Sequence, residues 1–278
     1  MPYVELALAG ALLTAVVLVA RPLLRQARRQ RLMAVPFPEA WRRIVEKNVP
    51  LYGRLPQALQ QELHGLIHIF LDEKRFEGCG GLEIDDTIRV TIAAQACMLL
   101  LNRKTTCFRK LRTILVYPDT YVAKTLSSDG RIAIDDHSVR LGESWQNGPV
   151  VLAWNSVTGG ASNIADARNV VFHEFAHQLD QEDGVADGAP VLERRSAYTA
   201  WARVLGEEYA ALQKSREARR RSVMSKYGAT HPAEFFAVAT ETFFEKPRQM
   251  QKRHPELYEE LRDYYRLDPL QWTARTRD

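Results

Sequence analysis

The chain contains little cysteine, and the spacing of its cysteines follows no disulfide framework. Its 278 residues include three cysteines, Cys79, Cys97 and Cys107, an odd number that argues against a disulfide-stapled secreted domain. Cys97 lies in the apolar run 92–101, so we expect its thiol to be buried and unreactive. A reducing compartment fits this cysteine usage best.

Glycine and proline are also scarce, at 15 and 13 residues, and the sequence has no internal repeat or low-complexity tract. With 46% hydrophobic and 26% charged residues, the composition is typical of a globular protein with one large domain or two small ones. The formal net charge of +4 is small, and two arginine-rich stretches, residues 21–31 and 216–221, carry much of it. Such runs are usually solvated faces, so we do not expect a nucleic-acid partner.

Charged residues are absent from Leu6–Ala20, a mostly apolar stretch of 15 residues. This is short for a membrane-spanning helix, which needs about 20 apolar residues. A signal peptide is disfavoured because no basic residue precedes the stretch and no cleavage site follows it. The basic stretch lies on the C-terminal side, which the positive-inside rule places in the cytoplasm. We therefore expect residues 3–20 to anchor a cytoplasmic enzyme domain to the inner membrane; a buried hydrophobic helix or a mis-assigned start codon is the alternative.

Pro36 and Pro38 interrupt the chain after the basic stretch, which predicts a division into residues 1–35 and a folded domain at 36–278. Apolar residues at helical spacing predict helices at 56–74, 86–101, 195–213, 233–245 and 254–266. Strands are predicted between the second and third of these, at 112–117, 131–135 and 150–154.

A stretch rich in Gly, Ser and Thr at 155–162 is predicted to be a loop. Ser162 or Asn163 is then predicted to cap a long helix that ends at Asp180. Helices, a small sheet and further helices follow one another in the chain. This order predicts an α+β fold, mostly helical with a small mixed sheet.

Residues 173–177 read His-Glu-Phe-Ala-His inside the predicted long helix. Side chains four residues apart share a helical face, so His173 and His177 can both reach one cation, and imidazole is a good ligand for Zn²⁺. Glu174 projects about 100° round the helix from His173, where its carboxylate can take a proton from an attacking water. His64 and His68 have the same spacing without the acid, and we interpret them as partly exposed or satisfied within the core.

A catalytic zinc needs a third protein ligand and an open fourth position. The downstream candidates are His231, His254, Glu234 and Glu241. Glu234 is the best of them because it opens a predicted helix whose phenylalanines would pack against the motif helix. Tyr227 stands seven residues earlier, where a phenol can donate a hydrogen bond to the oxyanion of a tetrahedral intermediate. On composition alone, a loop aromatic that covers the edge of the core is the better interpretation of Tyr227.

The spacing Tyr-x6-Glu-x-Phe after HExxH resembles the gluzincin arrangement of the anthrax lethal factor catalytic domain. Over more of the chain, the sequence resembles the Mlc titration factor A family of bacterial zinc peptidases. The segments that carry this resemblance are 173–180, 232–238 with Glu241 and Phe243-Phe244, 142–154 and 268–270. The similarity spans roughly residues 36–270 and is far more specific than HExxH by itself.

The resemblance implies a zincin-like metallopeptidase domain with one zinc ion held by His173, His177 and Glu234. It implies Glu174 as the general base and Tyr227 as the oxyanion donor. It also implies a peptide or protein substrate, cleaved in an aminopeptidase-like way, and a transcriptional repressor of the Mlc type as a partner. The alternative is a regulatory protein that binds a transcription factor, with zinc chiefly structural.

The sequence also departs from related patterns. Thermolysin-like enzymes and lethal factor place an acid four residues after the third ligand, where this chain has Val238. Glu241 or Asp180 is expected to orient a ligand instead, and the pattern does not choose between them. The alternation of residues 150–154 permits either an edge strand that pairs with the substrate backbone or an ordinary half-buried strand. The N-terminal hydrophobic segment lies outside the soluble family pattern.

Overall fold

The computed structural model describes residues 20–103, 107–119 and 148–272, together with the backbone of short strands between residues 120 and 147. The expected anchor at residues 3–20 therefore lies outside the described residues, apart from Ala20. None of the described helices is long and apolar enough to cross a membrane.

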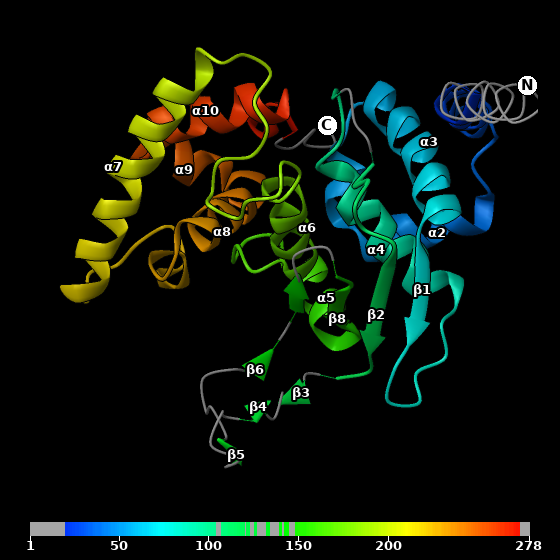
Figure 1. Ribbon diagram of the computed structural model, residues 1–278, viewed down its shortest axis with the longest axis horizontal. Coiled ribbons are helices and arrows are strands. Elements are labelled where there is room, and N and C mark those ends of the chain that lie inside the picture. The colour runs from blue at the N-terminus through cyan, green and yellow to red at the C-terminus, as the bar shows by residue number, and fades with distance from the viewer. Residues whose placement is uncertain are drawn as a thin grey trace, which may run out of the picture.

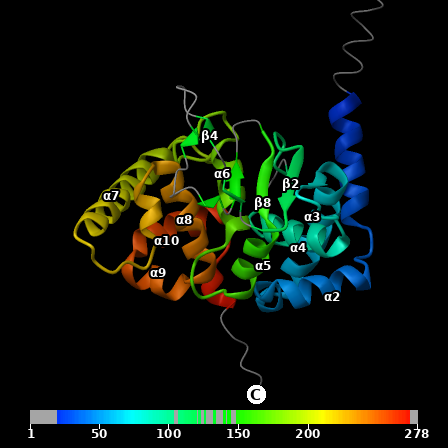
Figure 2. The same cartoon turned by 90° about the horizontal axis from the view of Figure 1, so that it is seen from below.

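Most of the described chain is helical. The first part of the chain forms α2 (Glu39–Asn48), the 3-10 turn η1 (Pro50–Arg54), α3 (Gln57–Glu73) and α4 (Asp86–Met98), and the first strand of the main sheet lies between α3 and α4. After the last strand come α5 (Trp154–Ser162), α6 (Val170–Asp180), α7 (Ala197–Glu217), the 3-10 turn η2 (Lys226–Ala229), α8 (Pro232–Glu245), α9 (Pro247–Arg253), α10 (Pro255–Tyr265) and the turn η3 (Pro269–Trp272). Figures 1 and 2 show α2 to α4 at one end of the molecule, α7 to α10 at the other, and α6 with the sheet between them.

The main sheet has four strands in the order β1 (Arg75–Gly78), β2 (Thr113–Tyr117), β8 (Val150–Ala153) and β7 (Gly142–Ser144). The first three are parallel and β7 runs antiparallel to β8, which confirms the predicted α+β class with a small mixed sheet. Because β8 pairs with β2 on one side and β7 on the other, the structure rules out the edge-strand alternative for residues 150–154. Two ribbons, β3 (Tyr121–Val122) with β6 (Val139–Arg140) and β4 (Thr125–Leu126) with β5 (Ile132–Ala133), complete the described strands.

The predicted helices at 56–74, 86–101, 195–213, 233–245 and 254–266 correspond to α3, α4, α7, α8 and α10. Asp85 caps α4, since its side chain accepts a hydrogen bond from the Ile88 backbone N–H at 2.8 Å. Pro232 occupies the first turn of α8, where its missing N–H costs no helical hydrogen bond. Helical periodicity therefore located most helices, with errors of a few residues at their ends.

The segment before the motif helix was predicted wrongly. Residues 155–162 belong to helix α5 rather than to a loop. The residues between α5 and α6 are not helical, so no single helix runs from Ser162 or Asn163 to Asp180. Asn169 caps α6 instead, because its side chain accepts a hydrogen bond from the Phe172 backbone N–H at 3.0 Å. The chain folds back tightly here: a Cβ on Gly160 would lie 2.7 Å from the Arg168 carbonyl oxygen.

The basic stretch near the N-terminus forms part of a helix at residues 20–33 that is attached to α3. Glu73, at the end of α3, accepts hydrogen bonds from both Arg25 and Arg29 at 2.7 to 3.1 Å. Arg28 pairs with the neighbouring Asp72. These arginines therefore hold the helix against the domain and are not simply a solvated face.

Candidate metal centre

The HExxH residues lie on α6, a helix buried along most of its length. Phe172, Phe175, Ala176 and Leu179 are all at most 1% exposed and fix the helix in the core. The His173 and His177 rings point to the remaining side, with ring centroids 4.9 Å apart and planes at 80°. The helical spacing thus places both imidazoles together, as predicted from the sequence.

Helix α8 brings the third candidate to these rings. It packs against α6, with the Phe172 and Phe244 ring centroids 5.1 Å apart. Glu234 lies in the first turn of α8, and its Oε2 is 2.9 Å from His173 Nε2 and 3.4 Å from His177 Nε2. Ligand atoms of all three residues lie within 4.8 Å of one another, so the structure assembles the predicted trio.

The carboxylates of Glu234 and Glu241 favour positive charge on the His173 ring. Burial opposes a charge on His173, yet Glu234 and Glu241 raise its pKa well above the ordinary value. Burial likewise opposes ionisation of Glu234, but hydrogen bonds with His173 and His177 hold its pKa below the usual range. Two imidazole nitrogens and a carboxylate oxygen are ligands that suit a divalent ion such as Zn²⁺. The residues present therefore fit a metal ion.

Glu174 adds a buried carboxyl group beside the trio. The residue is 4% exposed, and in the described structure its Oε2 has no hydrogen-bond partner. Burial raises the pKa of Glu174 to about 7, although the charges of His173 and His177 act in the opposite direction. A carboxyl group in this environment can both accept and release a proton near neutral pH.

Tyr227 lies on the open side of the site. It belongs to η2, which packs against α8, and Ser225 Oγ accepts a hydrogen bond from its backbone N–H at 3.3 Å. Its ring centroid is 5.9 Å from that of His173, and the residue is 56% exposed. The phenol therefore borders the trio at a position that a substrate can reach, instead of plugging the core.

The structure distinguishes between the two candidate orienting acids. Glu241 Oε1 lies 2.7 Å from His173 Nδ1, on the ring nitrogen opposite the one that faces Glu234. Asp180 Oδ2 instead accepts a hydrogen bond from the Gly188 backbone N–H at 3.0 Å. Glu241 is thus the acid that orients a candidate ligand, whereas Asp180 holds the loop after α6.

The other histidines that the structure describes have different roles. His64 and His68 are buried, His64 stacks on Phe37 with centroids 3.9 Å apart, and Tyr52 Oη lies 3.0 Å from His64 Nε2. These contacts confirm the interpretation of His64 as a core histidine, and burial lowers its pKa to about 4. His254 contacts Glu208, and His231 caps α8 by accepting a hydrogen bond from the Ala233 backbone N–H.

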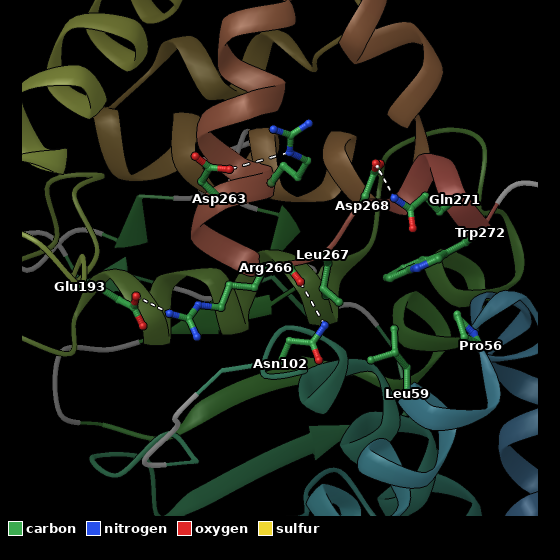
Figure 3. Close-up of a pocket in the computed structure, with 11 residues that line it drawn as sticks. Pro56, Leu59, Asn102, Glu193, Asp263, Arg266, Leu267, Asp268, Gln271 and Trp272 are labelled. Carbon is green, nitrogen blue, oxygen red and sulfur yellow. Dashed lines mark hydrogen bonds and ion pairs between the residues drawn. The ribbon is translucent and has the colours of Figure 1, made fainter.

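A pocket of about 580 Å³ lies elsewhere, between the start of α3, the end of α10 and η3 (Figure 3). Leu59, Leu267 and Trp272 contribute its apolar wall. Arg266 pairs with Glu193 across the pocket, and its carbonyl accepts a hydrogen bond from the Asn102 side chain at 3.1 Å. The lining includes none of the metal trio, so this pocket is separate from the candidate centre.

Sequence reasoning missed three buried polar residues beside the centre: Gln95, Asn169 and Glu245. Asn169 Nδ2 donates to Gln95 Oε1 at 2.9 Å and to Glu245 Oε1 at 3.2 Å. The position of Asn169 directly before an apolar helical run was a signal for a cap. Nothing in the sequence pattern indicated its two partners.

Comparison with known proteins agrees with this geometry. Residues 24–266 match the glucose-regulated metallo-peptidase M90 family. A Synechocystis sp. protein described as uncharacterized is 42% identical over 245 residues, which cover 87% of this chain and 89% of that protein. Mlc titration factor A of Escherichia coli is 31% identical over 249 residues, covering 88% and 91% of the two chains. Mlc titration factor A of Shigella sonnei is 31% identical over 242 residues, covering 86% and 88%.

Proposed function

The chain belongs to the glucose-regulated metallo-peptidase M90 family, and from that premise we propose that it hydrolyses peptide bonds at a zinc ion held by His173, His177 and Glu234. The observation that carries the proposal is the convergence of these three ligand atoms within 4.8 Å, from two helices. Three protein ligands leave a coordination position open, which is typical of catalytic rather than structural zinc.

The residues around the trio supply the other parts of a hydrolytic mechanism. A bound zinc ion would act as a Lewis acid that polarises the attacking water and the scissile carbonyl. Glu174 takes the proton from that water and passes it to the leaving amine. Tyr227 donates a hydrogen bond to the developing oxyanion from the open side of the site. Glu241 accepts a hydrogen bond from His173 Nδ1–H, which leaves Nε2 available as the ligand atom.

The substrate backbone would pair with β7. This short strand is one of the two outer strands of the described sheet, β1 being the other, and it contacts the motif helix α6. An extended peptide added at such an edge makes main-chain hydrogen bonds that do not select for side chains. We therefore assign substrate pairing, which was considered for strand 150–154, to the neighbouring strand β7. We propose aminopeptidase-like cleavage for the same site, because the resemblance noted above implies it.

The proposal extends to partner and location. Because two relatives carry the name Mlc titration factor A, we propose a transcriptional repressor of the Mlc type as a regulatory partner. We also propose a cytoplasmic catalytic domain with residues 3–20 as an inner-membrane anchor, on the strength of the basic residues at 21–31. The competing function is a repressor-binding protein with structural zinc, but a structural site would need neither Glu174 nor Tyr227.

The substitution Glu174→Gln tests the activity. It removes the proton acceptor while keeping the shape of the side chain, so zinc content should stay near one per chain and turnover should fall about 10²- to 10⁴-fold. Glu207→Gln, an exposed acid on α7, is the matched control. Peptides with free and with blocked N-termini separate aminopeptidase from endopeptidase cleavage. Wild-type turnover in Glu174→Gln would contradict the mechanism.

The same variant separates the two functions. If it still binds a repressor of the Mlc type and relieves repression in cells as well as the wild type does, partner binding is the function and peptidase activity is not needed for it. If relief of repression requires Glu174, the peptidase assignment is supported in its cellular setting.

A further inference from the structure

A buried hydrogen-bond network lies behind the metal trio, centred on Asn169. Its side-chain Oδ1 accepts from the Phe172 backbone N–H at 3.0 Å, while Nδ2 donates to Gln95 Oε1 at 2.9 Å and to Glu245 Oε1 at 3.2 Å. Its backbone N–H donates to Glu241 Oε2 at 2.7 Å. Asn169, Gln95, Glu241 and Glu245 are all at most 6% exposed. One residue therefore links α4, α6 and α8.

This network reaches a candidate ligand through Glu241. One oxygen of that carboxylate contacts His173 Nδ1 at 2.7 Å, and the other is held by the Asn169 N–H. With both oxygens engaged, the carboxylate has a fixed orientation. The His173 ring is then fixed as well, with Nε2 directed toward Glu234 at 2.9 Å.

The Asn169 side chain does more than a helix cap requires. A cap needs a single acceptor, as Asp85 shows on α4, where one side-chain oxygen accepts from the Ile88 N–H at 2.8 Å. Asn169 also presents an amino group, and both acceptors of that group come from other helices. A serine, threonine or aspartate would cap α6 without joining α4 to α8.

Glu245 and Glu241 lie one turn apart on α8, so two buried carboxyl groups are close together. Burial is the main cause that raises the pKa of Glu245 to about 8, and the charge of Glu241 adds to it. At neutral pH Glu245 therefore holds a proton and accepts from Asn169 through Oε1. The negative charge of the pair stays on Glu241, the acid that faces His173.

We infer that Asn169, supported by Gln95 and Glu245, is a positioning residue that fixes the Glu241 carboxylate and through it the zinc-binding orientation of His173. This inference rests on the proposed zinc site. Groups behind a metal-ligating histidine typically change metal affinity about 10- to 100-fold when they are altered. Because Asn169 acts through Glu241, we expect the lower end of that range.

The test compares zinc affinity with stability in the full chain. Asn169→Ser keeps a capping oxygen but removes the amino group, so it should weaken zinc binding about 10-fold, measured by competition with a chromophoric chelator. It should also alter the visible spectrum of the Co²⁺-loaded protein, which reports ligand geometry. Asp85→Ser, the equivalent change at the cap of α4, should leave zinc affinity and the Co²⁺ spectrum unchanged.

Two further variants keep the inference open to refutation. Gln95→Met leaves the α6 cap intact and should weaken zinc binding, by less than Asn169→Ser does. This variant replaces Asn169→Ser as the test if Asn169→Ser does not fold. When Glu241→Gln is already present, adding Asn169→Ser should lower zinc affinity little further, because the link from Asn169 through Glu241 to His173 is already disrupted. Wild-type zinc affinity in Asn169→Ser or Gln95→Met, or full additivity in the double variant, would overturn the inference alone. A wild-type chain that binds no zinc would overturn the proposed function and the inference with it.

Discussion

Replacing Glu245 by glutamine should make the protein more stable at alkaline pH. Glu245 is 6% exposed, and burial raises its pKa from an ordinary value near 4.5 to about 8. Between these two values the folded state keeps a proton that the unfolded state releases. Stability therefore falls as pH rises through this window. Glutamine has no proton to lose and can still accept from Asn169 through Oε1.

The size of the effect follows from the pKa difference. Each pKa unit corresponds to about 1.4 kcal/mol, so the full difference is an upper limit of about 5 kcal/mol above pH 8. We expect Glu245→Gln to be about 2 to 5 kcal/mol more stable than the wild type at pH 9, and to differ little from it near pH 4.5. That gain is a large part of the 5–15 kcal/mol that typically stabilises a domain.

Urea unfolding at pH 5, 7 and 9 measures this difference. A chelator keeps both proteins free of metal, because bound metal would add its own pH-dependent stability. Glu217→Gln, which removes an exposed acid from α7, is the control and should show the wild-type pH dependence. If Glu245→Gln had the wild-type pH dependence, or were the less stable protein at pH 9, Glu245 would not be a buried protonated acid and the network would need another explanation.

Three further changes test other parts of the structure. Tyr227→Phe should lower kcat about 10²- to 10³-fold with zinc content unchanged, and an unchanged kcat would exclude the phenol as oxyanion donor. Gly188→Ala should lower the free energy of unfolding in urea by about 1 to 3 kcal/mol, because Gly188 has a φ of +79° and a Cβ would lie 2.6 Å from the Pro232 carbonyl oxygen. Wild-type stability in this variant would contradict that close contact. Glu73→Gln should speed hydrogen exchange in residues 20–33 without changing zinc affinity, and unchanged exchange would show that the ion pairs do not hold this helix.

The sequence predicted that the His173 and His177 rings lie together in the candidate metal centre, as the structure shows. His173 and His177 share one helical face wherever α6 packs, because four residues make about one turn. The sequence also identified Glu234 as the best candidate for a third ligand. Its distance from the two rings depends on how α8 packs against α6, which the sequence pattern does not give. The choice between Glu241 and Asp180 lay beyond the pattern altogether. Each acid lies on a helix that carries a candidate ligand, and only the fold shows that Asp180 accepts a hydrogen bond from the Gly188 N–H.

The main error in the fold has a related cause. The composition of residues 155–162 is typical of a loop, because Gly, Ser and Thr favour turns. In the structure this segment forms α5, with Val157, Gly160 and Ala161 buried. Gly160 has no side chain, which allows the Arg168 carbonyl to approach closely. Tertiary packing thus determines both this helix and the break before Asn169, and neither is encoded in local propensity.

The metal content of the purified protein tests the central claim most directly. The wild-type chain should contain one zinc per molecule, and His177→Ala and Glu234→Ala should each lose it while remaining folded by circular dichroism. Zinc retained at the wild-type level by Glu234→Ala would contradict the ligand set and move the third ligand elsewhere.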